Sequence, residues 1–250
     1  MSDVKPEPPL FRRLVAELLG TGLLVTVMVG SGIAAQTLSP SDVGVQLLEN
    51  SLATMLGLAV LILVFGPVSG AHFNPVVSVV DWLLGRRDGT GLSAPEVVAY
   101  GFAQVAGGIL GAVLANVRFD LPAAQMATTD RVSMGHGVGE VVATTGLVLL
   151  IFALARSGRA ALSAASVGAY IGAAYWFTSS TSFANPAVTV GRIFSDTFAG
   201  IAPASVPLFV TAQVLGAGLG LALVRLLFPD GPAAAGRAVA PHATAVTEKG

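Results

Sequence analysis

Hydrophobic residues occur along this chain in long runs that are separated by short polar stretches. Six runs are long enough to cross a bilayer as helices, for which about 20 mainly apolar residues are needed. They cover approximately residues 12–35, 48–66, 95–117, 136–156, 162–179 and 206–228. The pattern therefore predicts an all-α membrane protein with six transmembrane helices.

Two shorter apolar segments interrupt this pattern, one after the second predicted helix and one after the fifth. They begin at Asn74-Pro75-Val76 and at Asn185-Pro186-Ala187 and run for about ten residues, too few to span a bilayer. Asparagine can cap the first free N–H groups of a helix, and proline is well tolerated at the first helical position. Irregular backbone inside a membrane is allowed only where it lines a cavity, so the pattern predicts two re-entrant half-helices.

The composition agrees with a membrane protein and excludes several functions. Hydrophobic residues make up 54% of the chain and charged residues 11%, whereas a soluble domain has about 25% charged residues. The net charge of −1 gives no reason to expect a nucleic-acid partner. The absence of cysteine excludes disulfides and thiol chemistry. No nucleophile–base pair or metal-ligand set converges on the half-helices, so we expect neither an enzyme nor a cofactor.

The basic residues divide unequally between the two sides of the predicted topology. One side carries Lys5, Arg12, Arg13, Arg86, Arg87, Arg156, Arg159, Arg225, Arg237 and Lys249, and the other carries Arg118, Arg131 and Arg192. Because basic residues are enriched on the cytoplasmic side of membrane proteins, we expect both termini to be cytoplasmic. The expected organisation is a cytoplasmic segment over residues 1–11, a channel domain over 12–228 and a disordered tail over 229–250.

Three landmarks recur in the same order in the two halves of the chain. The matching pairs are Glu17 and Glu140, Asn74 and Asn185, and Gln104 and Gln213. Each half contains three predicted spans, an odd number, so the second half must insert with the opposite orientation. The sequence therefore predicts inverted repeats over about residues 12–117 and 136–228, an arrangement that places a pathway at the midplane of the membrane.

The residues around the two Asn-Pro pairs carry a family resemblance. The stretches Ser69-Gly70-Ala71-His72-Phe73-Asn74-Pro75-Val76-Val77 and Phe183-Ala184-Asn185-Pro186-Ala187-Val188 resemble the paired boxes of aquaporins and glycerol facilitators, the major intrinsic protein superfamily. The resemblance covers about residues 11–228. It implies the aquaporin fold, with six spans and two half-helices, and a homotetramer in the bacterial inner membrane. It also implies passive flow of neutral solutes past two half-helix dipoles, whose positive ends oppose cations.

In this family a constriction outside the boxes selects the solute through four positions. Counting from the boxes places Thr54, Ala173, Ser182 and Val188 there. Most members carry arginine where this chain has Val188, and all four residues here are small and uncharged. The resemblance therefore implies a wide filter that lacks the usual cation, so that cation exclusion rests more heavily on the half-helix dipoles.

The segment from Thr178 to Arg192 resembles a bacterial branch linked with arsenic resistance, which favours arsenite, methylated arsenicals and polyols as solutes. A glycerol or water facilitator is the near alternative. An ion-coupled secondary transporter would also show inverted repeats and broken helices, but it would normally need a titratable group at mid-membrane, where this sequence places asparagine.

Several polar residues have more than one interpretation. Glu17 and Glu140 could form a proton relay, but their symmetric placement favours a scaffold that accepts hydrogen bonds from the re-entrant loops, with Gln104 and Gln213 joining helices. His72 either lines the inner mouth or is a hydrogen-bonded structural imidazole. Arg192 either guards the outer mouth or neutralises the C-terminus of the half-helix. Asp81 and Asp196, near the C-terminal ends of the half-helices, are expected to be solvated at the membrane interface.

Overall fold

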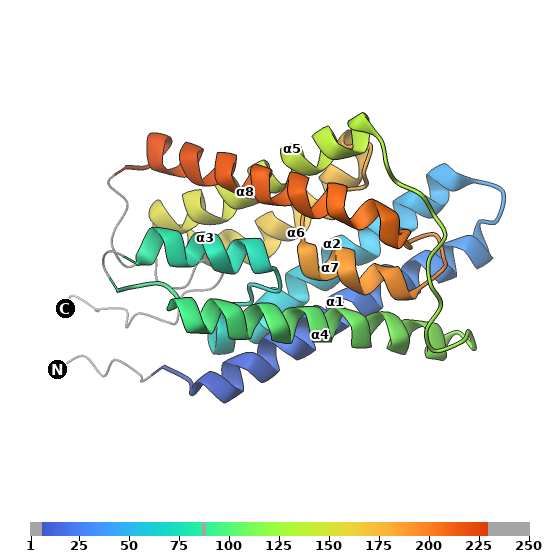
Figure 1. Cartoon of the computed structure of the whole chain (residues 1–250), viewed down its shortest axis with the longest axis horizontal. Coiled ribbons are helices and arrows are strands. Elements are labelled where there is room, and N and C mark those ends of the chain that lie inside the picture. Colours follow the sequence, from blue (N-terminus) through green and yellow to red (C-terminus); the bar gives the residue numbers. More distant parts are fainter. Residues whose placement is uncertain (1–6, 87–88, 230–250) are drawn as a thin grey trace, which may run out of the picture.

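The computed structural model describes residues 7–86 and 89–229, and this part of the chain consists of helices and loops without strands (Figure 1). The α-helices are α1 (Leu10–Leu38), α2 (Val43–Ser69), α3 (Pro75–Gly85), α4 (Ala94–Arg118), α5 (Met134–Arg156), α6 (Ser163–Phe177), α7 (Pro186–Gly191) and α8 (Val206–Leu227). The expectations that concern the disordered tail, Lys5, Arg87, Arg237 and Lys249 fall on residues 1–6, 87–88 and 230–250, outside the described residues.

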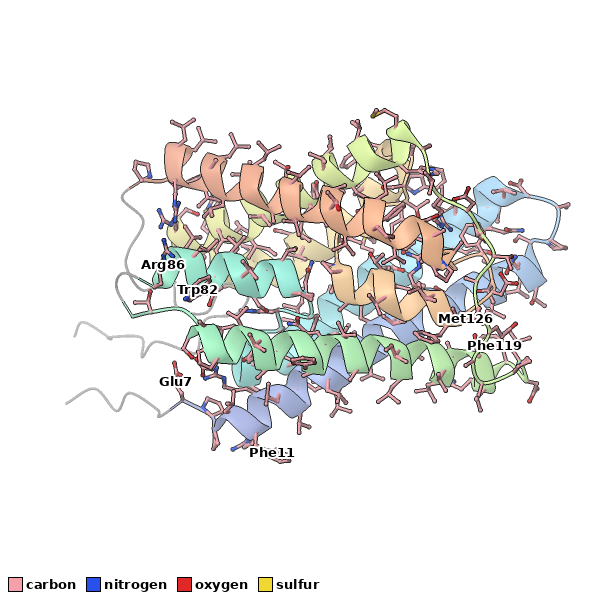
Figure 2. The ribbon with its side chains drawn as sticks, viewed as in Figure 1. Glu7, Phe11, Trp82, Arg86, Phe119 and Met126 are labelled. Atoms are coloured by element: carbon pink, nitrogen blue, oxygen red, sulfur yellow. The ribbon has the colours of Figure 1, made fainter. Side chains whose placement is uncertain are left out.

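The six predicted transmembrane helices are confirmed. Among the described residues, six helical segments are long and apolar enough to cross a membrane, and they correspond to α1, α2, α4, α5, α6 with its preceding 3-10 turn, and α8 with its preceding 3-10 turn. Their outward side chains are largely apolar: Phe11 and Phe102 are each 75% exposed. Figure 2 shows Phe11 and Phe119 standing at opposite ends of the bundle. A surface of this kind is stable against lipid rather than water.

The helices pack in two matching groups, one of α1, α2 and α4 and the other of α5, α6 and α8. The most extensive contacts are those of α1 with α4 and of α5 with α8, while α2 and α6 contact each other. The short helices α3 and α7 lie between these groups and enter from opposite ends of the bundle (Figure 1). The first and last described residues lie at the same end of the bundle as the C-terminus of α3. We call this the terminal end, and the opposite one the far end.

Glycine allows the closest helix approaches in both groups. A β-carbon added to Gly111 in α4 would lie 2.1 Å from the carbonyl oxygen of Gly22 in α1. A β-carbon added to Gly216 in α8 would similarly lie 2.6 Å from the carbonyl oxygen of Val141 in α5. Each contact is accompanied by a threonine hydroxyl bond across the interface, from Thr26 to the carbonyl of Gly111 and from Thr145 to that of Gly216, both 3.0 Å. Small residues at these positions let the backbones meet, as is common in membrane bundles.

The two half-helices differ in length more than the sequence pattern predicts. Helix α3 has 11 residues, but α7 has only 6 and continues as a 3-10 turn from Arg192 to Phe194. The carbonyls of Ile193 and Phe194 accept hydrogen bonds from the backbone N–H groups of Ala127 and Gln125, in the loop between α4 and α5. This competing loop explains why the helix stops early, a tertiary contact that no local pattern could reveal.

Candidate functional site

The two asparagines at the half-helix starts bind each other's loops at the centre of the bundle. The Asn74 side-chain nitrogen donates to the carbonyl of Ala184 over 2.7 Å, and that of Asn185 donates to the carbonyl of Phe73 over 2.8 Å. Their oxygens cap the half-helices by accepting from Val76 and from Ala187. Pro75 and Pro186 occupy the first helical positions. Each amide nitrogen has two hydrogens and uses one here, so a second donor of each remains for a solute oxygen.

The backbone before each asparagine is held in a left-handed conformation that only glycine adopts freely. Ala71 and Phe73 both have φ of 49°, and the matching residues Ser182 and Ala184 have φ of 53° and 48°. Such positions raise the energy by about 1–3 kcal/mol each and persist only where neighbouring contacts hold them. In each loop, one residue outside the left-handed region, His72 or Phe183, separates these two left-handed residues. This sequence of conformations turns successive backbone N–H groups toward one side of the loop.

Two buried carboxylates receive those N–H groups. Glu17 accepts from the backbone nitrogens of His72 and Phe73, at 3.0 and 2.7 Å. Glu140 accepts from those of Phe183 and Ala184, at 2.9 and 2.8 Å. Gln104 and Gln213 each donate to the carboxylate of their own half, over 2.7 and 2.6 Å. The same geometry in both halves shows that these carboxylates anchor the strained loops that present the asparagines.

A cavity of about 50 Å³ runs past the two asparagines. This volume is enough for a few water-sized molecules, since one water occupies about 10–15 Å³ on the same measure. The lining side chains are mainly apolar: Leu24, Met28, Thr54, Leu58, Ile62, Ala71, His72, Phe73, Asn74, Val77, Leu147, Ile151, Val167, Ile171, Ser182, Phe183, Asn185 and Val188. Three of the four expected filter residues, Thr54, Ser182 and Val188, thus face one cavity.

Ala173 departs from the expectation. It lies on the exposed face of α6 beside Trp176 and Phe177, which are 52% and 54% exposed, and it does not line the cavity. The count back from Asn185 passes through residues 178–184, where Thr181, Ser182 and Ala184 are left-handed. An irregular loop of this kind breaks the fixed relation between sequence distance and helix face.

Two aromatic residues that the sequence analysis did not select lie close to the expected filter residues. Tyr175, 2% exposed, brings its hydroxyl within 3.2 Å of the Thr54 hydroxyl, and Phe183 lines the cavity. The sequence analysis expected only small residues at this position, but aromatic rings also lie there: Phe183 on the cavity wall and Tyr175 beside Thr54. The two-residue step from Ala173 to Tyr175 moves a position to the other side of a helix, which is the signal that could have found Tyr175.

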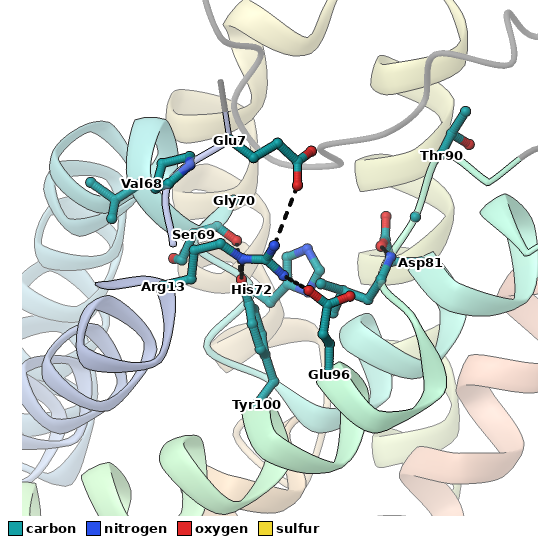
Figure 3. Close-up of a pocket in the computed structure, with 13 residues that line it drawn as sticks. Glu7, Arg13, Val68, Ser69, Gly70, His72, Asp81, Thr90, Glu96 and Tyr100 are labelled. Carbon is teal, nitrogen blue, oxygen red and sulfur yellow. Dashed lines mark hydrogen bonds and ion pairs between the residues drawn. The ribbon is translucent and has the colours of Figure 1, made fainter. Parts of the chain in front are cut away.

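His72 joins the central cavity to a second one at the terminal end, of about 60 Å³. Its ring nitrogen Nδ1 lies 3.1 Å from the Ser78 hydroxyl, so the imidazole both lines the pathway and is hydrogen-bonded. Figure 3 shows the Arg13 guanidinium projecting into this second cavity toward Glu7, Glu96 and Tyr100. Its ion pair with Glu96 measures 2.6 Å. The cavities thus lie in series from the asparagines toward the terminal end.

Comparisons with known proteins agree with this geometry. Residues 6–183 match the Major intrinsic protein family. The chain belongs to this family. It is 50% identical over 224 residues to "Aquaglyceroporin AqpS" of Rhizobium meliloti (strain 1021), an alignment that covers 89% of this chain and 93% of that protein. It is 30% identical over 238 residues to "Probable aquaporin AqpM" of Archaeoglobus fulgidus, with 83% and 93% covered.

The fold has a solved counterpart. The aquaglyceroporin of Plasmodium falciparum superposes with a TM-score of 0.63 at 20% identity, covering 88% of this chain and 98% of that one. The predicted all-α aquaporin fold is confirmed, as is the prediction of a membrane channel rather than an enzyme. This member of the major intrinsic protein family is an integral multi-pass membrane protein that conducts solutes passively.

At the far end of the channel, the backbone N–H of Arg192 binds the carbonyls of Val188 and Val190 at the end of α7, whereas its guanidinium binds a different loop. Arg192 is 2% exposed, its Nε donates to the carbonyl of Ala199, and its guanidinium carbon lies 3.5 Å from the ring centre of Phe183. Arg131, from the loop between α4 and α5, lies 5.3 Å from the same ring centre. Burial lowers the pKa of Arg131 from its ordinary value. The pKa of Asp130 is lowered, first by the hydrogen bond from the backbone N–H of Val132 and second by that from the Ser205 hydroxyl.

Of the two carboxylates expected to be solvated at the interface, Asp81 differs because it is buried, whereas Asp196 is exposed as expected. Asp81 is 5% exposed and accepts from the backbone nitrogen of Leu92 over 2.8 Å. Asp196 accepts from the backbone nitrogen and the hydroxyl of Thr128, over 2.8 and 3.0 Å. Each therefore fixes a loop beside a half-helix, the first at the terminal end and the second at the far end.

The scaffold role of the channel's two carboxylates makes a testable prediction. Glu140→Ala leaves two backbone donors and one amide donor without acceptors in a buried loop, at about 1–3 kcal/mol each. We expect the thermal midpoint of the detergent-solubilised protein to fall by more than about 10 °C, with Glu17→Ala behaving alike. Glu49→Ala is the matched control, because the Glu49 carboxylate accepts a hydrogen bond from the Ser39 hydroxyl rather than from a strained loop. An unchanged midpoint with lost flux would support the proton relay instead.

Proposed function

We propose that this channel conducts small uncharged hydroxylated solutes through a filter wide enough for polyols, arsenous acid and methylated arsenicals. The observation that carries the proposal is Val188, a small apolar side chain that is 1% exposed and shares the cavity wall with Ser182 and Thr54. Where a long cationic side chain would narrow the passage, this chain leaves room for a solute broader than water.

The chemistry of the wall supports a solute with one apolar and one polar side. Phe183, Ile171 and Leu24 form apolar surface, while the asparagine amides and the hydroxyls of Thr54 and Ser182 provide hydrogen bonds. Among the described contacts, the Ser182 hydroxyl has no protein partner although it is buried. A buried hydroxyl normally has a partner, and a permeating hydroxyl group would supply one. Glycerol and arsenous acid both offer several hydroxyls on a small neutral body.

A glycerol or water facilitator is the near alternative, and the name aquaglyceroporin of the Rhizobium relative favours glycerol among its solutes. An ion-coupled transporter has less support. Of the described side chains that line the central cavity, His72 is the only titratable one, and its imidazole is already bonded to Ser78. Coupling to ions normally requires a charged or titratable site at mid-membrane.

The proposal includes an orientation and an assembly. The described basic residues at the terminal end are Arg12, Arg13, Arg86, Arg156, Arg159 and Arg225, and those at the far end are Arg118, Arg131 and Arg192. This excess favours a cytoplasmic terminal end in a bacterial inner membrane. The exposed apolar faces fit lipid and the subunit contacts of a homotetramer with one pore in each subunit.

Flux measurements in proteoliposomes test the proposal. We expect water, glycerol and arsenous acid each to enter at least about tenfold faster than into protein-free liposomes, because the filter admits all three. Methylarsenate, presented at a pH where its neutral form is abundant, is expected to enter more slowly. Stopped-flow light scattering and arsenic analysis give the rates. Exclusion of every solute larger than water would contradict the wide filter, and saturable, gradient-coupled uptake would contradict a channel.

A further inference from the structure

Among the residues that the structure describes, two arginines at the far end of the pathway form no ion pair. Within the described part of the chain, ion pairs are formed by Arg13, and neither Arg131 nor Arg192 forms one. The neighbouring carboxylates are engaged elsewhere: Asp130 binds Val132 and the Ser205 hydroxyl, and Glu140 binds the loop before Asn185. Both guanidiniums are therefore charged without a carboxylate in direct contact, although Glu140 attracts both at longer range. The charge of the buried Arg192 is poorly screened by salt.

Neutral carbonyls hold the two guanidiniums in place. Arg131 donates through Nε to the carbonyl of Gly200 over 2.9 Å and through Nη2 to that of Phe198 over 3.2 Å. Arg192 takes the intervening carbonyl, that of Ala199. Three successive carbonyls of one loop thus fix two like charges without neutralising them. The Nη1 nitrogen of Arg192 is buried and has no hydrogen-bond partner within the described part of the chain.

The two charges share one ring, and that ring belongs to the pathway. The guanidinium carbons of Arg192 and Arg131 lie 3.5 and 5.3 Å from the ring centre of Phe183. Phe183 lines the central cavity together with Val188, which lies one helical turn before Arg192. The two like charges at this ring repel each other, and the Glu140 carboxylate attracts both without forming an ion pair with either among the described contacts. A positive potential therefore remains beside a ring of the pathway.

We propose that Arg131, Phe183 and Arg192 form a cation barrier at the far mouth of the channel, supplying the positive field that Val188 does not. The field of fixed charges in a low-dielectric wall repels metal cations and protonated amines while leaving neutral solutes unaffected. Cation exclusion in this chain therefore does not depend on the half-helix dipoles alone. The proposal concerns which species are excluded, so it rests only on conduction by this pathway and not on the identity of the neutral solute.

The test compares charge removal at three far-end arginines in proteoliposomes. Arg192→Gln keeps a donor for the Ala199 carbonyl but removes the charge, and Arg131→Gln does the same at its site. Arg118→Gln is the matched control, because Arg118 is exposed at the end of α4. The readouts are potassium permeability from dilution potentials and water permeability from stopped-flow scattering.

We expect the ratio of potassium to water permeability to rise about tenfold in Arg192→Gln, less in Arg131→Gln and most in the double variant. The ratio should stay unchanged in Arg118→Gln, and Arg192→Lys, which retains a charge, should remain cation-tight. If Arg192→Gln does not assemble, the barrier is still tested by the potassium-to-water ratio of Arg131→Gln, which should rise, and of Arg192→Lys, which should not. Water-conducting glutamine variants with no cation leak would overturn the barrier. Failure of the wide filter would appear differently, as excluded glycerol and arsenous acid in the unsubstituted protein.

Discussion

Val188→Arg is expected to lower glycerol and arsenous acid flux at least about tenfold while lowering water flux only about two- to threefold. Val188 is buried against a cavity of about 50 Å³ and faces Thr54 and Ser182, so a longer side chain extends into the space that a solute must cross. The new guanidinium would also lie beside the Arg131–Phe183–Arg192 cluster and add a third like charge there. Stopped-flow scattering on matched proteoliposomes measures both rates.

Two further variants separate width from charge and test the register of the filter. Val188→Leu adds bulk without charge, so a selective loss of glycerol flux in both variants assigns the effect to width. Ala173→Leu is the matched control, because Ala173 lies on the exposed face of α6 and a leucine there meets lipid. We expect Ala173→Leu to conduct as the unsubstituted channel does. Unchanged flux in Val188→Arg would mean that residue 188 does not face the constriction.

The parts of the fold that sequence reasoning predicted correctly are those set by local signals. Runs of apolar residues define the six spans, because a bilayer demands both length and apolarity from each helix. The starts of α3 and α7 follow from asparagine caps and from proline at the first helical position, both readable within a few residues. The equivalence of Glu17 and Glu140 in the two repeats could be recognised because both halves contain the same landmarks in the same order.

The parts that could not be predicted depend on contacts between distant segments. Between α6 and Asn185 lie left-handed residues whose number and conformation no periodicity specifies. The count therefore predicts Ala173 at the filter, whereas in the structure Tyr175 is the α6 residue that approaches Thr54. Arg131 reaches Phe183 only because its loop crosses the far end of the bundle and meets the carbonyls of residues 198–200. A charge in a loop looks solvated in a sequence until such a partner is known.

Gly111→Ala is expected to destabilise the protein by about 3 kcal/mol, since its β-carbon would lie 2.1 Å from a carbonyl oxygen of α1 and the backbones must separate. Gly101→Ala, in the same helix, is the matched control. Apart from the adjoining turns of its own helix, no atom of the residues that the structure describes lies within 4 Å of its β-carbon, so higher helix propensity should stabilise the protein by up to about 1 kcal/mol. Thermal unfolding of the detergent-solubilised variants measures both.

The separation at Gly111 should also reach the pathway. Glu17 lies on α1 and its partner Gln104 on α4, joined by a bond of 2.7 Å that a shifted helix would lengthen. Loss of that bond loosens the carboxylate that holds the left-handed loop before Asn74, so we expect Gly111→Ala to reduce water flux as well as stability. Equal melting of the two alanine variants would show that α1 and α4 can repack around a methyl group. A lower melting temperature with full flux would show that the loop is anchored independently of this interface.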